Sequence, residues 1–188
     1  FQSALFNKAL FSIGFRFNWN SHEEDILIAP RINIDFSLDR GWGNIIYNSG
    51  TYFQNPPEKY LSIVDNNDLK TINTFQHSLT FEKLITNSTK FSISIYKKNY
   101  HRAPMMEKNQ AFTDPTFLLD ELRTYLNIIS NGKAETSGVE ILLEKKRAIN
   151  FYGLVGGSVY NSIYNDQNGI KRNRNNNYEY LFNLVGGY

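Results

Sequence analysis

Apolar and polar residues alternate along much of this chain. In residues 11–19 every second position is Phe, Ile or Trp, and the positions between them are small or polar. The same period of two returns in residues 31–39 and 91–96. Because successive side chains of a β-strand point to opposite faces, the pattern predicts strands with one apolar face and one polar face.

About eight segments carry this pattern or a related run of β-forming residues. They lie near 9–20, 26–39, 44–55, 73–83, 88–100, 125–145, 150–165 and 176–188. We therefore predict an all-β chain that folds as an antiparallel up-and-down meander of about eight long strands. One segment near 114–122 departs from the pattern. Asp114 and Pro115 precede an apolar run there, which predicts a single short helix.

The predicted connections alternate between short and long. Tight turns are expected at 40–43, 84–87 and 146–149, and longer loops near 21–25, 56–72, 101–124 and 166–175. In up-and-down order all tight turns fall at one end of the sheet, as in outer-membrane barrels. Several predicted strands also have the 9–11 residues or more that cross a bilayer at a tilt. We therefore expect part of a large transmembrane β-barrel, although alternation alone would also suit a soluble β-sandwich.

Charged residues at the polar positions favour the barrel as well. A mixed set of charges suits a water-filled or plugged lumen and would be expensive in a sandwich core. The residues expected to face the lumen are Arg16, Arg31, Asp35, Glu82, Glu140 and Glu144. Aromatic residues at strand ends suit either the interfacial girdles of a barrel or a protein core. They are Trp19, Phe53, Tyr100, Phe151, Tyr164 and Tyr178.

Composition excludes several partners. The formal net charge is +2 and the charges are spread along the chain, so no nucleic-acid partner is expected. The cluster of Lys171, Arg172 and Arg174 is interpreted as a solvated loop. The chain has no cysteine and no run of about 18 apolar residues, which excludes disulfides, thiolate metal sites and a membrane-spanning helix.

We find no catalytic constellation and expect neither an enzyme nor a bound metal or cofactor. The three histidines, His22, His77 and His101, are far apart and lack metal-ligand spacing. The acidic run at 23–25 is interpreted as a solvated loop tip rather than a cation site. The phrase Gly41-Trp42-Gly43 lacks the third glycine of a dinucleotide fingerprint and is interpreted as a turn.

Six short phrases, in order along nearly the whole chain, resemble the barrel of TonB-dependent receptors. They are Ser12-Ile13-Gly14-Phe15-Arg16, Ala29-Pro30-Arg31-Ile32, Gly50-Thr51-Tyr52-Phe53-Gln54-Asn55-Pro56-Pro57, Ser94-Ile95-Tyr96-Lys97-Lys98, Asn131-Gly132-Lys133-Ala134 leading to Gly138-Val139-Glu140-Ile141, and Asn183-Leu184-Val185-Gly186-Gly187-Tyr188. The fifth phrase is the most telling, because it is similar to the family's Asn-x-Gly-x-Ala-x-Gly-Val-Glu. Its Gly138 is expected to relieve crowding on the lumen face. The chain resembles the C-terminal half of such a barrel.

The resemblance implies a barrel of about 22 strands in the bacterial outer membrane, with a plug domain inside it. It implies outer-membrane lipid and the TonB complex as partners, and TonB-coupled uptake of a scarce small-molecule or glycan ligand, such as a siderophore, a vitamin or a glycan. Residues 1–188 begin and end inside strand patterns, so we expect a fragment, with the plug domain and the TonB-contacting segment outside it. Loops often carry binding residues, and the longest loop is expected to meet the ligand. The residues expected there are His101, Arg102, Glu107 and Lys108.

Two other functions remain open at this stage. A passive porin-type barrel would keep the same strand rhythm without a plug. A soluble β-sandwich or lipocalin-like binding module would bury the apolar faces of its strands in a shared core.

Overall fold

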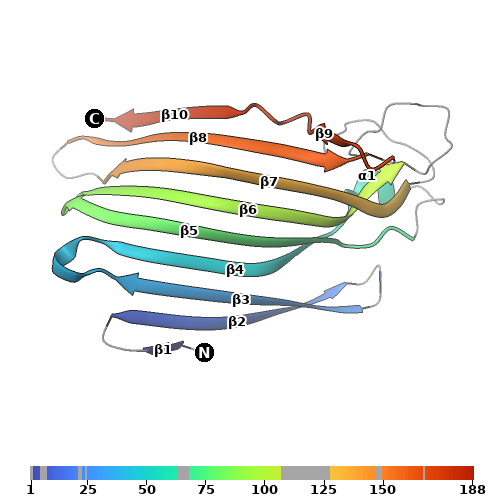
Figure 1. The fold of residues 1–188 in the computed structure, drawn as a ribbon, viewed down its shortest axis with the longest axis horizontal. Helices are drawn as coiled ribbons and strands as arrows, with labels where there is room; N and C mark the ends of the chain where they lie inside the picture. Colours follow the sequence, from blue (N-terminus) through green and yellow to red (C-terminus); the bar gives the residue numbers. More distant parts are fainter. Residues whose placement is uncertain are drawn as a thin grey trace.

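Within the described residues, the computed structural model forms one antiparallel sheet whose strands follow one another in chain order (Figure 1). The strands are β1 (Gln2–Ala4), β2 (Ala9–Asn20), β3 (Asp25–Ser37), β4 (Asn44–Gln54), β5 (Ile72–Thr86), β6 (Thr89–Met106), β7 (Ile128–Lys145), β8 (Tyr152–Asn165), β9 (Lys171–Asn173) and β10 (Tyr180–Gly187). Each strand from β1 to β8 pairs with the next, and both β9 and β10 pair with β8. The predicted all-β meander of about eight long strands is confirmed.

The structure describes residues 2–4, 8–20, 23, 25–62, 68–106, 128–146, 150–166 and 168–188. The helix predicted near 114–122 lies outside these residues. So do two of the predicted ligand-binding residues, Glu107 and Lys108, and also His22 and Glu24.

Several element boundaries differ from the prediction. The strands β5 and β6 are joined by the two-residue turn Asn87–Ser88. The turn was expected at 84–87, so the observed turn is shorter and begins later. The strand β6 continues to Met106, which places His101 and Arg102 in a strand instead of the predicted loop near 101–124. The strand β9 lies inside the predicted loop at 166–175. The strand β6 thus continues to pair beyond the point where alternation stops, and β9 adds a short separate pairing with β8.

The two ends of the sheet differ, as the loop lengths predicted. At one end lie the Asn87–Ser88 turn and the 3-10 turn η1 (Asp39–Gly41); at the other lie the short helix α1 (Glu58–Leu61) and β9 (Figure 1). The chain reverses at η1 through positive φ angles at Arg40, Gly41 and Gly43. A Cβ atom at Gly43 would lie 2.2 Å from the backbone oxygen of Glu82, so only glycine fits there.

Buried apolar side chains gather at the end that carries α1. One cluster contains Tyr60 of α1, Leu69, Met106 and Ile128, which are 5% exposed or less. Along the middle of the strands, in contrast, many large apolar side chains are exposed. The buried core of the described residues therefore lies at the loop end of the sheet. It does not cover either face along the middle of the strands.

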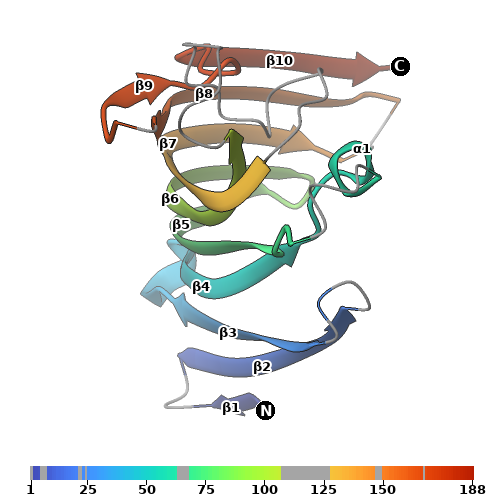
Figure 2. The ribbon, with the colours of Figure 1, turned by 90° about the vertical axis from the view of Figure 1, so that its right-hand side faces the viewer.

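The sheet is open. Its two outermost strands, β1 and β10, do not pair with each other, so the sheet does not close into a barrel. Figure 2, seen from the end that carries α1, shows the strands stacked in one layer from β1 to β10. In the part of the chain that the structure describes, no helix is long and apolar enough to span a membrane.

Candidate functional site

One face of the sheet is a continuous apolar band. A single row of mutually opposed residues crosses eight strands of the sheet. The row consists of Phe11, Ile34, Tyr47, Leu79, Ile95, Val139, Val159 and Tyr180. Ile95 is 50% exposed and Val159 is 67% exposed. The next row toward the turns, which includes Phe81, Ile93 and Ile141, is also apolar. Exposed apolar surfaces of this extent usually mark an interaction with another protein or a membrane.

Polar residues bound this apolar band on the strands in the middle of the sheet. The row next to it on the loop side consists of Ser49, His77, Lys97, Ser137 and Asn161. On the turn side, the Lys83 ammonium lies 4.7 Å from the centroid of the exposed Trp42 ring. On β6 the band lies between Thr89 and Lys97, which are roughly 27 Å apart along the strand. For a strand tilted as in a membrane barrel, this corresponds to roughly 20 Å along the membrane normal.

The opposite face carries the polar residues. All six residues predicted to face a lumen occupy the alternate positions of β2, β3, β5 and β7, and so lie on this face; they are Arg16, Arg31, Asp35, Glu82, Glu140 and Glu144. One row of this face consists of Asp35, Ile46, Thr80, Ser94, Glu140 and Ser158. We call this whole side of the sheet the polar face. That it lines a lumen stays a prediction.

Neighbouring strands interact through side chains on the polar face. Hydroxyl pairs join Thr80 to Ser94 (2.9 Å) and Thr136 to Ser162 (2.7 Å). The amide nitrogen of Asn33 donates to the side-chain oxygen of Asn48 at 2.7 Å. These hydrogen bonds satisfy polar groups of neighbouring strands on the polar face.

An ionic group lies near the turn end of the polar face. The Lys90 ammonium lies 3.6 Å from Glu82 and 3.9 Å from Glu144, so it links two of the predicted lumen residues across three strands. All three side chains are about a third exposed, and exposed pairs of this kind contribute little to stability. The Lys90 ammonium therefore offsets the charges of the two carboxylates and contributes little to the stability of the sheet.

Large side chains on the polar face lie over glycines. The Arg31 guanidinium lies 4.5 Å from the centroid of the Tyr52 ring, and a Cβ at Gly50 would come within 2.9 Å of the Arg31 side chain. A Cβ at Gly138 would lie 2.9 Å from the Tyr96 hydroxyl. The crowding expected at Gly138 is therefore present on the polar face, and glycine leaves room for the tyrosine.

The two described residues of the predicted ligand site lie at the loop end of β6. His101 is opposite Asn73, and Arg102 has a φ of 59° where the register with β7 shifts. Both side chains are exposed. A residue in this left-handed conformation interrupts the regular alternation of side chains between the two faces of the strand. The Arg102 side chain therefore does not take the direction that an extended strand would give it.

Arg102 lies near a carboxylate that joins two loops. The Glu23 carboxylate accepts hydrogen bonds from the backbone amide and the hydroxyl of Thr71 and from the Asn20 amide group. Burial raises the pKa of Glu23, but the Thr71 hydrogen bonds and the charges of Arg102 and Lys70 outweigh it, and the net pKa lies below its ordinary value. Glu23 therefore links its loop to Thr71, and although its side chain is still partly exposed, it is not only a solvated group at a loop tip.

The basic cluster near residue 172 is also held in place. The Arg172 guanidinium donates to Asp166 at 2.8 Å, and the Lys171 ammonium lies 3.5 Å from Glu135. The Arg174 guanidinium lies 5.1 Å from the centroid of the Tyr100 ring. Lys171 and Arg172 are exposed, as the interpretation of a solvated segment expected, but the segment contains strand β9 and its side chains contact other residues.

The aromatic residues at strand ends divide into two groups. Trp19, Phe151 and Tyr178 are exposed, as an interfacial girdle requires. Tyr164 is buried with Ala103 and Ala134, and Tyr100 packs against this cluster, so these two tyrosines belong to a local core. Phe53 is half-buried on the apolar face at the loop end of β4.

The sequence analysis did not identify the charged residues that lie along the border of the apolar band. Lys97 follows Ile93 and Ile95 at the same spacing of two, so counting onward along the strand would have placed it on the apolar face. Its ammonium lies 3.3 Å from Glu135 of the neighbouring strand. The sequence gives no comparable indication for Lys171, which reaches Glu135 only through the pairing of β9 with β8.

No group of three or more His, Asp or Glu side chains is placed to hold a metal ion within the described ranges. His77 lies opposite Lys97, and His101 lies further along the same pair of strands. No model of a known protein family matches the chain, and no curated protein matches it.

Proposed function

We propose that this sheet is a segment of a transmembrane β-barrel in a bacterial outer membrane, with its apolar band toward lipid and its polar face toward the lumen. The observation that carries the proposal is the contrast between the two faces. Ile95 on the apolar face is 50% exposed, whereas Ser92, three residues earlier on the polar face, is 8% exposed. A soluble sheet that faces water on one side has its polar residues on that side and its apolar residues in the core.

Strand length and loop arrangement support the same proposal. The strands β2 to β8 have between 11 and 18 residues, which meets the length that a tilted strand needs to cross a bilayer. Short turns at one end and longer connections at the other are typical of outer-membrane barrels.

The function we propose for the barrel is a receptor for TonB-coupled uptake of a scarce small-molecule or glycan ligand. The support is the ordered resemblance of six phrases to the TonB-dependent receptors. In such a receptor the polar face contacts water or a plug, and the loop end, which includes His101 and Arg102, is the side that meets the ligand. A passive porin-type barrel is the second candidate, because it would have the same apolar band.

Fluorescence quenching by brominated lipid tests the orientation. Ile141→Trp and Ser158→Trp lie at nearly the same height on opposite faces, because Ile141 is opposite Gly157 and Ser158 is opposite Glu140. The intact protein is reconstituted in brominated phosphatidylcholine with Trp19 and Trp42 replaced by Phe. We expect quenching at Ile141→Trp and little at Ser158→Trp, after subtraction of the parent signal. A soluble sandwich requires that neither is quenched.

Ligand uptake tests the transport function separately. We expect accumulation of ligand in cells that express the intact protein to require TonB and an energised inner membrane. Uptake that is unchanged in a strain without TonB would favour the porin. Binding to His101→Ala and Arg102→Ala variants would show whether the loop end of β6 contacts the ligand.

A further inference from the structure

We propose that the loop-side edge of the apolar band binds one lipid with an anionic phosphate headgroup. Its acyl chain lies on Tyr47, Leu79 and Ile95, and its phosphate lies among Lys97, Lys133 and Lys171. This inference rests on the orientation proposed above, because it requires the apolar face to meet the membrane.

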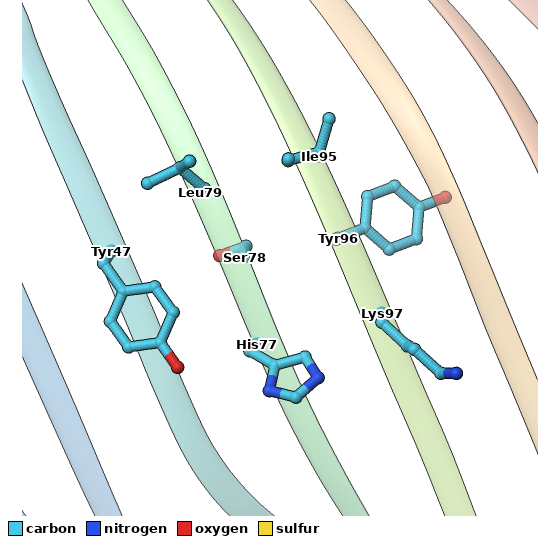
Figure 3. Close-up of a pocket in the computed structure, with 7 residues that line it drawn as sticks. All are labelled: Tyr47, His77, Ser78, Leu79, Ile95, Tyr96 and Lys97. Carbon is cyan, nitrogen blue, oxygen red and sulfur yellow. The ribbon is translucent and has the colours of Figure 1, made fainter.

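The acyl part of the site is an open pocket of about 300 Å³ on three adjacent strands. Figure 3 shows Tyr47 on β4, His77 and Leu79 on β5, and Ile95 and Lys97 on β6, side by side across these strands. Tyr47 is opposite Leu79, and Leu79 is opposite Ile95, so the three form a continuous apolar floor. His77 and Lys97, also opposite one another, form the polar end of the pocket.

The headgroup part is a second pocket of about 260 Å³, further toward the loop end on the same face. The side chains that line it from the apolar-face positions include His101, Lys133, Glu135 and Lys171. Glu135 is the one carboxylate among its described lining residues. Lys97 connects the two pockets, because it lines the first and its ammonium lies 3.3 Å from Glu135 in the second.

The charges around Glu135 favour an anion. One Glu135 oxygen lies 3.3 Å from Lys97 and the other lies 3.5 Å from Lys171. Two ammonium groups therefore flank one carboxylate, and a third lysine, Lys133, lines the same pocket. A phosphate would supply further oxygen acceptors to these lysines, and clusters of lysine beside a membrane attract anionic headgroups.

The continuity of the two pockets selects a lipid over a soluble anion. A free phosphate would use only the lysines and would leave Leu79 and Ile95 exposed. A lipid covers both, with its apolar chain on the band and its headgroup above the band's edge. The long lysine side chains can also extend away from the hydrocarbon while their methylene groups stay over apolar surface.

Native mass spectrometry of the intact, delipidated protein in non-ionic detergent tests the site. The probes are phosphatidylglycerol, phosphatidylcholine with the same acyl chains, and inorganic phosphate. The variants are Lys97→Gln and Lys171→Gln, and the control is Lys98→Gln. Lys98 is the next residue along β6 and lies on the polar face, 5.5 Å from the centroid of the Tyr96 ring.

We expect the first bound phosphatidylglycerol to be favoured over phosphatidylcholine, and Lys97→Gln or Lys171→Gln each to weaken its binding about fivefold. Lys98→Gln should leave its binding unchanged. Equal binding of the two lipids, or an equal effect of Lys98→Gln, would overturn the inference. Displacement of the lipid by an equal concentration of inorganic phosphate would also overturn it and would indicate a soluble-anion site.

Failure of this site and failure of the proposed orientation are distinguishable. If Ile141→Trp is quenched by brominated lipid but no preference for phosphatidylglycerol is found, the barrel orientation stands and the lipid site is wrong. If Ile141→Trp is not quenched, the orientation itself is wrong, and with it the basis for a lipid site.

Discussion

An arginine placed on each face of β7 and β8 gives the sharpest test of the energetics. Ile141 lies in the middle of the apolar band, since its partner Ile93 is four residues from Thr89 and four from Lys97 on β6. Ser158 lies one register position away on the polar face, directly opposite Glu140. The variants Ile141→Arg and Ser158→Arg therefore place the same charge at the same height, on opposite faces.

The expected magnitudes follow from these surroundings. An arginine on the lipid face costs about 2–4 kcal/mol near the bilayer midplane and about 0–1 kcal/mol near the interfaces. The central position of Ile141 puts Ile141→Arg in the first range. At Ser158 the guanidinium meets water and the Glu140 carboxylate, so the change should stay within about 0.5 kcal/mol, as for ordinary surface substitutions.

Reversible unfolding of the intact protein from lipid vesicles, followed by denaturant titration, measures both changes. The comparison is valid if the dependence of the free energy on denaturant concentration is the same for both variants. Equal losses of stability at Ile141→Arg and Ser158→Arg would refute the assignment of faces. A loss at Ile141→Arg without lipid quenching at Ile141→Trp would indicate a protein core behind the apolar band.

Three further outcomes are expected from the described contacts. Gly138→Ala should destabilise the protein by about 1–3 kcal/mol in the same titration, because its Cβ would lie 2.6–2.9 Å from its neighbours, whereas Gly14→Ala, with nothing within 4 Å, should be nearly neutral. Lys90→Gln should cost no more than about 1 kcal/mol, and less at high salt, because its ion pairs are partly exposed. The lowered pKa of Glu23 means that its charged form stabilises the fold above the unfolded-state pKa of about 4.3, and that this contribution is lost as pH falls through the lower folded-state pKa. The stability difference between the wild type and Glu23→Gln should therefore be present at neutral pH and shrink as the pH falls below the unfolded-state pKa of about 4.3. A difference that grows on acidification would contradict this.

Alternation along the chain was sufficient to predict the order and direction of the long strands. In residues 11–19 and 31–39 the side chains repeat every two positions, and the structure pairs these segments antiparallel. The pattern failed at the loop end of β6, where Arg102 takes a left-handed conformation and the register shifts. Pairing continues through such an irregularity, because backbone hydrogen bonds do not depend on which residue type occupies the position.

The contacts at the loop end could not be predicted in the same way. Glu23 and Thr71 are 48 residues apart, and Lys171 and Glu135 meet only because β9 pairs with β8. Period-two counting assigns residues to faces within one strand and carries no information about which loops meet. The same counting would have placed Lys97 on the apolar face, so that part of the lipid site was accessible from the sequence.

The open edges of the sheet constrain the proposed location. Inside the hydrocarbon of a membrane, each backbone group without a hydrogen-bond partner costs several kcal/mol, so strands persist there only in closed barrels. The long strands β3 to β8 have partners on both sides, whereas β1 covers only Leu10 to Ser12 of β2, and β10 pairs only with β8. If the apolar band meets lipid, both edges of the sheet must gain a neighbour. Closure of the sheet into a barrel would then enclose the polar face, on which Arg31 and Tyr96 lie. The hydrogen-bonded side chains of the polar face would thereby be separated from the lipid that surrounds the apolar band.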